Sequence, residues 1–448
     1  MLTPSSALDQ VASLISAATR AGADAADAIY VCNASTQVQV RLGALEDVER
    51  SEGEEIGLRL FVGRRSASVS SSDLSADALA ALVDRAIAMA REAPEDKWSG
   101  LAPADRLLSG PLAEVEADDG ADPVPADLRA RALAAEDAAR AVAGVTNSEG
   151  ASASASRSVF SLGTSYGFAG GYSTSGYGSS ASVIAGEGLG MQRDYGYHSS
   201  RHLSGLEDPA AIGRRAGDRA VARLNPGKLA SGQMPVVFDP RVGSSLLGHL
   251  TGAITGPAIS RRTSFLLERL GQPVFAPGIT IRDDPHRLRG LRSKPFDGEG
   301  LPTAPTDIIA DGVLTGWLLD SASARQLGLA PTGHAVRGVG GPPGAGTSNL
   351  YMMPGALPPE ELIADIRLGL FVTELIGQGV NGVTGDYSRG ASGFVIRDGA
   401  IAEPVAEITI AGNLKDMFLA LTPANDLEFR RASDVPTIRI EGMMVAGA

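Results

Sequence analysis

Residues 148–190 read SEGASASASRSVFSLGTSYGFAGGYSTSGYGSSASVIAGEGLG, and the fold of the first half of the chain depends on their structure. Their Gly and Ser content is typical of a flexible linker. They also carry more large side chains than a solvated linker does: Val159, Phe160, Leu162, Tyr166, Phe168, Tyr172 and Tyr177. Small residues between large ones suit strands that pack closely in a sheet. We therefore predict ordered strands in this stretch.

The residues before this stretch alternate between helix and strand patterns. Thr3 followed by Pro4 is typical of a helix start, and apolar residues then repeat at helical spacing until Gly22. A second helix is expected between Ser75 and Pro94. β-branched content and alternation predict strands, with a hairpin turn at 63–65, over Ala28–Cys32, Thr36–Leu42, Glu55–Val62 and Ser66–Ser70.

The first domain is predicted to end near residue 225. Residues 94–125 are rich in Pro, Gly and Asp and form a connector within this domain, and a helix is expected over about 126–142. Another helix opens at Asp208-Pro209 and ends at Asn225-Pro226-Gly227. Residues 1–225 are therefore expected to form one domain of helices and a sheet.

The second half of the chain has a different character. A strand is predicted over 235–239 and a helix over 241–254, followed by strands and turns with many Gly and Pro residues. We expect residues 226–448 to form a mostly β domain with a helix packed on its sheet. The predicted fold class is α+β, with two domains.

Composition excludes several classes of function. The chain has 39 Lys and Arg against 52 Asp and Glu, a net charge of −13, which argues against binding to nucleic acid. One cysteine excludes an internal disulfide framework and a Cys-rich zinc module. No apolar run reaches the roughly 18 residues of a membrane span, and the start lacks the features of a signal peptide. We expect a cytoplasmic protein.

The five histidines show no complete metal site by themselves. His198 and His202 have helical H-x3-H spacing, but the aromatic residues and Gly196 around them favour a strand, where the two side chains would lie roughly 13 Å apart. His249, His286 and His334 are most simply structural residues, and Cys32 a buried thiol. We also expect Asp283 and Asp284 to lie in a solvated turn, and Arg261 and Arg262 to contact a carboxylate or a partner.

Several long motifs resemble the TldD/PmbA family of bacterial peptidases, and specifically its PmbA (TldE) branch. The resemblance covers nearly the whole chain. The motifs that carry it are Ser182–Ala185, Met191–Tyr195, Gly278–His286, Lys294–Gly300, Gly316–Arg325, GDYSRGASGF at 385–394 and EPVAEITIAGNLKDM at 403–417.

The resemblance implies a heterodimer in which only the TldD-type subunit binds metal. That subunit holds zinc through an H-E-x-x-x-H helix and a C-terminal cysteine, with the Glu as general base. Carried onto this chain, the ligand, base and second ligand positions are Ser244, Ser245 and His249. The segment for the third ligand, 427–435, has no cysteine. One ligand of three is too few for catalytic zinc, so we predict no catalytic metal in this chain.

The resemblance also implies substrates and contacts. Unfolded or linear peptides are the expected substrates, and the zinc is expected in the TldD-type partner subunit. Candidate residues for contact with peptide or partner are Arg261, Arg262, Asp386, Tyr387 and Arg389. The isolated chain is a candidate homodimer.

Two other functions remain open from the sequence. One is an independent metallopeptidase with divergent ligands among His198, His202 and His249. The other is a regulatory protein without enzymatic activity that acts on gyrase through protein contacts. Peptidase activity of the chain alone, abolished by a chelator, would distinguish an independent metallopeptidase from the other functions.

Overall fold

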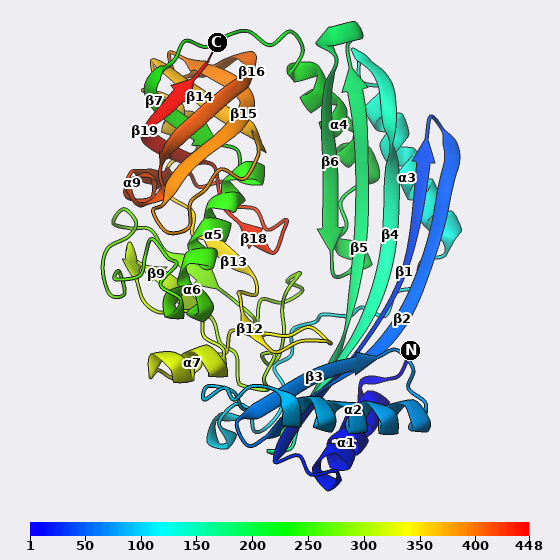
Figure 1. Ribbon diagram of the computed structural model, residues 1–448. Coiled ribbons are helices and arrows are strands. Elements are labelled where there is room, and N and C mark those ends of the chain that lie inside the picture. Colours follow the sequence, from blue (N-terminus) through cyan, green and yellow to red (C-terminus); the bar gives the residue numbers. More distant parts are fainter. Residues whose placement is uncertain (448) are drawn as a thin grey trace.

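A computed structural model describes residues 1–447. An antiparallel sheet of six strands dominates the N-terminal region, in the order β3-β2-β1-β4-β5-β6 (Figure 1). The strands are β1 (Ala25–Arg41), β2 (Ala44–Val62), β3 (Arg65–Ser71), β4 (Val145–Thr164), β5 (Ala169–Ala185) and β6 (Gln192–Ser200). The Gly- and Ser-rich stretch forms β4 and β5, which confirms the prediction of ordered strands.

The two strands predicted over Ala28–Cys32 and Thr36–Leu42 are one continuous strand, β1. The polar residues between them do not interrupt it, because Asn33 pairs with Gly53 of β2 and with Ser158 of β4. Hydrogen bonds to β2 on one side and to β4 on the other pair the backbone N–H and C=O groups of this segment, whatever its side chains are. The prediction of a break here was wrong.

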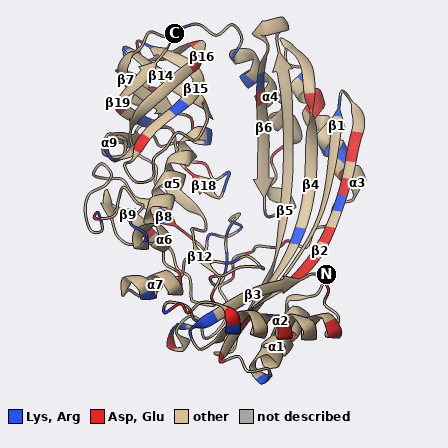
Figure 2. Ribbon diagram, in the orientation of Figure 1, with Lys and Arg blue, Asp and Glu red and all other residues tan. Residues whose placement is uncertain are grey.

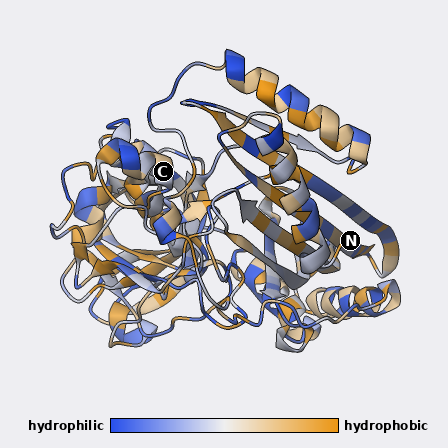
Figure 3. Cartoon of the chain, turned by 90° about the horizontal axis from the view of Figure 1, so that it is seen from below, coloured by the Kyte–Doolittle hydropathy of each residue, from blue (hydrophilic) through white to orange (hydrophobic). Residues whose placement is uncertain are grey.

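Four helices cover one face of this sheet. They are α1 (Pro4–Arg20), α2 (Ala76–Glu92), α3 (Pro125–Arg140) and α4 (Pro209–Ala222). Caps at Thr3, Ser75 and Asp208 define where α1, α2 and α4 begin, in agreement with the sequence. Even-numbered residues of β1 pack under all of them, with Ala28 and Tyr30 beside α1 and α2 and Val38 and Val40 beside α3 and α4. Hydrophobic and hydrophilic residues recur along the helices (Figure 3), as expected for helices that pack one side on a sheet and expose the other.

The other face of the sheet changes from apolar to polar along the strands. At one end, Ile29, Phe160, Leu162 and Tyr172 pack against Phe296 of the C-terminal domain. Farther along, the side chains of β4 and β5 on this face are small and uncharged, because these strands alternate Ser and Gly with the alanines under the helices. This polar part includes Gln37 and Gln39 of β1, Ser152, Ser154 and Ser156 of β4, and Gly176, Gly178 and Ser180 of β5.

The outer arm of β2 is exposed and acidic. Residues 44–55 pair with β1 only, because β3 pairs with β2 from Ile56 onward. The arm carries one basic residue, Arg50, against Glu46, Asp47, Glu49, Glu52, Glu54 and Glu55 (red on β2 in Figure 2). Like charges along an edge strand oppose its pairing with a second copy of the same edge.

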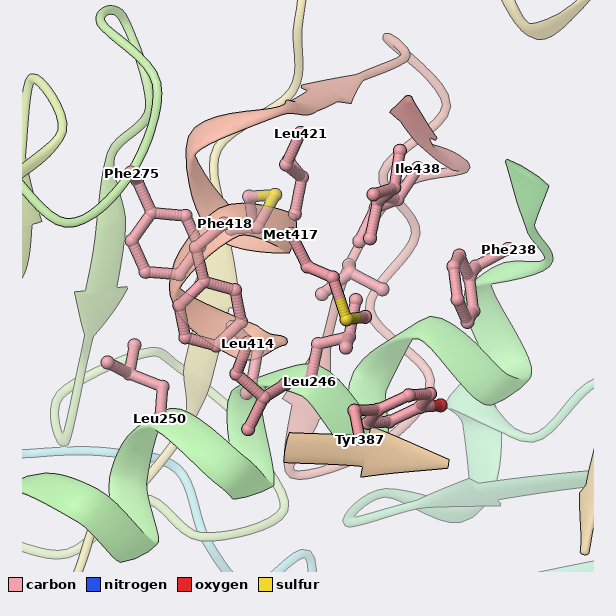
Figure 4. Packing of buried hydrophobic residues seen from close by; sticks show 14 of the residues in the cluster. Phe238, Leu246, Leu250, Phe275, Tyr387, Leu414, Met417, Phe418, Leu421 and Ile438 are labelled. Carbon is pink, nitrogen blue, oxygen red and sulfur yellow. The ribbon is translucent and has the colours of Figure 1, made fainter. Parts of the chain in front are cut away.

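A small barrel forms the core of the β-rich C-terminal domain. Its strands are β7 (Gly232–Phe238), β14 (Leu368–Ile376), β15 (Asp386–Arg397), β16 (Ala400–Asn413) and β19 (Ile438–Ala446), and pairing of β16 with β19 closes it. Helices α5 (Pro240–Ile254) and α9 (Leu414–Leu419) place Leu246, Leu250 and Phe418 in the core of this domain (Figure 4). The predicted strand and helix near residues 235–254 are confirmed as β7 and α5.

Short elements complete the C-terminal domain and surround the barrel. They are α6 (Gly256–Ser260), β8 (Ile281–Asp283), β9 (Thr306–Ala310), β10 (Val313–Leu314), α7 (Ser321–Leu327), β11 (Ala335–Val336), β12 (Gly344–Ala345), β13 (Leu350–Met352), α8 (Pro359–Ile363), β17 (Leu421–Pro423) and β18 (Ser433–Asp434). The fold is thus mixed α+β, with an N-terminal helix-and-sheet region and a C-terminal β-rich domain. No helix within residues 1–447 is long and apolar enough to cross a membrane.

Asp283 is buried, so the prediction of a solvated turn at this residue was wrong. Its carboxylate accepts hydrogen bonds from the Ser348 backbone N–H at 2.8 Å and from the Ser348 hydroxyl at 2.9 Å. The pairing of β8 with β13 places Asp283 opposite Leu350 and so brings it to Ser348. The linear sequence does not indicate this contact between Asp283 and Ser348. Burial raises the pKa of Asp283 to about 6.

Glu299 makes stability depend on pH. It is buried, and its carboxylate accepts hydrogen bonds from the backbone N–H and the hydroxyl of Ser321. Burial, reinforced by the charge of Asp297 and opposed by Arg59, raises its pKa from 4.5 to about 7. Between pH 4.5 and about 7 the folded chain keeps the proton on Glu299, whereas the unfolded chain loses it. The free energy of unfolding therefore falls as pH rises through this range.

We therefore expect Glu299→Gln to stabilise the protein at pH 8 by about 2–3 kcal/mol and to change little at pH 4. The measurement is urea unfolding of both proteins at the two pH values. Comparing variant with parent cancels the effects of other groups, including His334, whose pKa burial lowers to about 4. An equal effect at both pH values would contradict this assignment.

Candidate functional site

The positions that the sequence assigns to the degenerate motif lie on α5. The Asp239 carboxylate caps this helix by accepting a hydrogen bond from the Arg241 backbone N–H at 2.8 Å. Buried leucines hold the helix in the domain core: Leu246, Leu247 and Leu250. The three motif positions are only partly buried: Ser244, Ser245 and His249.

His249 contacts an aromatic ring and has a buried, unpaired nitrogen. Its ring lies 5.9 Å from that of Tyr387 on β15, at 79°. The Nε2 atom is buried without a hydrogen-bond partner among the described residues. Burial, and then the charge of Arg389, lowers the pKa of His249, so the imidazole is neutral at pH 7. It lines a hollow of about 310 Å³ together with residues that include Phe265, Val380 and Gly382.

The two serines do not complete a metal site with His249. The Ser245 hydroxyl donates to the Val242 carbonyl at 2.7 Å, within its own helix. Within residues 1–447, no group of three or more His, Cys, Asp and Glu side chains lies close enough to hold a metal ion. Catalytic zinc takes three protein ligands and an open position. One imidazole beside two serine hydroxyls does not fit that requirement.

A cluster of ion pairs lies beside Ser245 and joins the two parts of the chain. Asp194 of β6 binds Arg241 of α5 at 2.7 Å and Arg223 at 3.4 Å, and Arg223 also pairs with Glu374 of β14. Burial alone would raise the pKa of Asp194, but the hydrogen bonds and charge of Arg241 hold it below its usual range. The cluster therefore places guanidinium groups where a metal ion would need anionic or neutral ligands.

The segment assigned to the third ligand does pass α5. A Cβ at Gly243 would lie 3.1 Å from the Val435 side chain, so this side chain packs against the helix at Gly243. Arg430 and Arg431 of this segment line a hollow of about 240 Å³ with Arg241. Arg430 also binds Glu207 of the N-terminal region at 3.2 Å. The topology brings the segment to the helix, and two of the side chains that it places there are arginines (Figure 2 shows basic residues next to β18).

The structure brings together two of the five predicted contact residues. Tyr387 lies against His249, and Arg389 lies beside both Tyr387 and Ser245. Arg261 and Arg262 are exposed after α6, where Arg262 is 3.9 Å from Glu268. The exposed Asp386, the first residue of β15, accepts hydrogen bonds from Thr384 and Asn413.

His198 and His202 are engaged in local hydrogen bonds. The His198 Nδ1 accepts from the Glu207 backbone N–H at 3.1 Å, and the His202 Nε2 donates to the Glu116 carbonyl at 2.9 Å.

Sequence reasoning missed Asp194, Arg223 and Arg241. Asp194 lies in the Met191–Tyr195 motif, which could have indicated it.

Comparison with known families finds matches along most of the chain. Family models described as PmbA/TldA metallopeptidase domain 1, central domain and C-terminal domain match residues 26–90, 118–224 and 231–447. An Escherichia coli O157:H7 protein described as metalloprotease PmbA is 39% identical over 95% of this chain and 92% of that protein.

Two solved structures share the fold. A Bacteroides thetaiotaomicron protein, described as a candidate modulator of DNA gyrase, superposes with a TM-score of 0.92 at 27% identity and covers both chains fully. TldE from Thermococcus kodakarensis has a TM-score of 0.88 over 98% of this chain and 100% of that chain. At 20% identity this second likeness concerns the fold alone.

Proposed function

The chain belongs to the PmbA/TldD family of metallopeptidases, and from this membership we propose that it is the metal-free subunit of a heterodimeric metalloprotease. In this proposal a TldD-type partner carries the zinc, and the substrates are unfolded or linear peptides. The observation that carries the proposal is the chemistry of α5, where serines occupy the ligand and base positions and arginines line the hollow beside Ser245.

The side chain at the base position of the motif supports a non-catalytic role. Metal-assisted hydrolysis requires a group that takes a proton from the attacking water. Ser245 stands at the base position, and a serine hydroxyl is not such a base at neutral pH without an adjacent one. His249 is the one motif position with a matching side chain, and it faces Tyr387.

The sheet of the N-terminal region suits a peptide of variable sequence. Its helix-free face is lined by small, uncharged Ser and Gly residues of β4 and β5, which leave room for different side chains. β6 is the last strand in the sheet order, so one of its edges has no partner strand within residues 1–447. Strand addition at such an edge binds through main-chain hydrogen bonds and tolerates many sequences.

Co-expression with a TldD-type partner tests the proposal. We expect cleavage of an unfolded peptide only when both chains are present, and zinc only in samples that contain the partner. His249→Ala in this chain should leave the zinc content of the complex unchanged, because the metal is held elsewhere.

The matched control is a complex in which the partner's own general-base Glu is replaced, and it should be inactive. Chelator-sensitive cleavage by this chain alone would instead establish the independent metallopeptidase. Recovery of gyrase, and no TldD-type chain, from a pull-down would favour the regulatory function.

A further inference from the structure

A second hollow, of about 300 Å³, lies between the two parts of the chain next to Ser245. Strand β6, the end of α4, helix α5 and strands β14 and β15 all contribute to it. Its polar lining residues are Arg193, Asp194, Tyr195, Arg223, Arg241, Ser245, Thr373, Glu374 and Arg389.

Three buried polar atoms of this lining have no hydrogen-bond partner among the described residues. They are Arg241 Nε, Arg389 Nε and Thr373 Oγ1. The side chain of Arg241 is 6% exposed and Thr373 is 6% exposed, so water has little access to either. Each of the three atoms carries a hydrogen that it can donate, and a buried donor left unpaired costs free energy. These three donors therefore lie in residues that form the wall of the hollow, and the described residues offer them no acceptor.

The charges in the lining leave one guanidinium free. Four arginines face two carboxylates, and both carboxylates are already engaged: Asp194 by Arg241 and Arg223, and Glu374 by Arg223. Arg193 is 3.7 Å from Glu149. Arg389 has no ion-pair partner within the described part of the chain, although it lies beside the hydroxyl of Tyr387. Arg389 is therefore the arginine of this lining that no carboxylate of the described residues neutralises.

We propose that this hollow binds a carboxylate group of a peptide, with Arg389 as its main anchor and with Arg241 and Thr373 as further donors. A guanidinium and a carboxylate form paired, charge-assisted hydrogen bonds. Tyr195, which is 45% exposed, and Leu375 offer apolar surface for the rest of the residue that bears the carboxylate. The inference rests on the proposed function, because it takes the ligand to be a linear peptide.

The test measures peptide binding to the full chain without any partner. The probe is a fluorescent-labelled hexapeptide of Gly, Ser, Ala and Phe, made with a free C-terminal carboxylate, as its C-terminal amide, and as the amide with one internal Asp. We expect the carboxylate form to bind about tenfold more tightly than the amide. If the Asp-containing amide also binds tightly, the carboxylate is recognised on a side chain as well; if it does not, the chain terminus is the ligand.

Arg389→Gln should abolish the difference between the acid and amide peptides, and Arg389→Lys should retain part of it. The matched control is Arg397→Gln, on the same strand, where the arginine is exposed and pairs with Glu403. Circular dichroism and thermal unfolding establish that each variant is folded. The control should keep the full discrimination of the parent chain.

Equal affinity for the carboxylate and for both amide forms would overturn the inference, as would discrimination that persists in Arg389→Gln. No binding of the carboxylate peptide at millimolar concentration would also overturn it. This result is separable from the proposed function. If the complex cleaves peptides and this chain shows no preference for the carboxylate peptide, only the proposed carboxylate site is rejected. If this chain prefers the carboxylate peptide and cleavage does not depend on the partner, only the proposed heterodimeric protease is rejected.

Discussion

Replacing Asp27 with alanine is expected to lower the free energy of unfolding by about 3–5 kcal/mol. Asp27 of β1 is 1% exposed and lies between two buried arginines. Arg59 of β2 donates to it from Nε at 3.1 Å, and Arg337 of the C-terminal domain has its Nη1 at 2.6 Å. Burial would raise the pKa of Asp27, but the charges of Arg337 and Arg59 hold it below its usual range.

The reason for so large an effect is the charge that remains. Without the carboxylate, two guanidinium groups stay buried, and removal of one member of a buried pair costs far more than the pair contributes. Asp27→Asn keeps the shape of the side chain and should be nearly as destabilising. Urea unfolding at neutral pH measures both variants.

The matched control for Asp27 is Glu403→Ala, which breaks the exposed pair with Arg397. Solvent screens that pair, so the change in stability should be much smaller. Similar losses for Asp27→Ala and Glu403→Ala would show that burial does not govern these interactions.

Replacing Phe296 with alanine is expected to lower the free energy of unfolding by about 3–5 kcal/mol. Phe296 is 1% exposed and is the residue of the C-terminal domain that fills the apolar end of the sheet. Its ring centroid lies 4.9 Å from that of Phe168, 5.5 Å from Tyr172 and 6.0 Å from Phe160. The variant leaves a cavity between strands β4 and β5 and the C-terminal domain, which rigid strands fill poorly.

Phe429→Ala is the matched aromatic control, because Phe429 is 42% exposed and contacts Tyr351 and Arg287 at the surface. Thermal unfolding followed by circular dichroism should show a much smaller change for this control. A loss for Phe296→Ala no larger than that of the control would mean that this cluster does not hold the two parts together.

Local patterns predicted much of the secondary structure. Thr3, Ser75 and Asp208 cap α1, α2 and α4 as expected, because capping involves only a residue and the next few backbone N–H groups. The continuity of β1 was missed, since strand length depends on the neighbouring strands that satisfy its backbone. The burial of Asp283 was missed for a similar reason, because Ser348 is 65 residues away.

The candidate site divides in the same way. The sequence predicted the helix α5, and the family resemblance assigned the motif positions, among them His249, to that helix and the third-ligand segment to residues 427–435. It did not predict that Asp194, Arg223, Arg241 and Glu374 form one cluster. These residues come from strands and helices that are far apart in the chain, and only their packing joins them.

By itself the sequence therefore determined which residues are present: residues 244 and 245, which the family resemblance aligns with a ligand and the base, are serines, and residues 427–435 contain no cysteine. Ligand identity is a property of single residues, so a list of residues is enough to establish it. Only the tertiary structure decided which side chains lie beside Ser245, namely an ion-pair cluster with several arginines. Whether a guanidinium has an ion-pair partner depends on carboxylates within a few ångströms: in the described part of the chain Asp194 and Glu374 pair with Arg223 and Arg241, and Arg389 forms no ion pair.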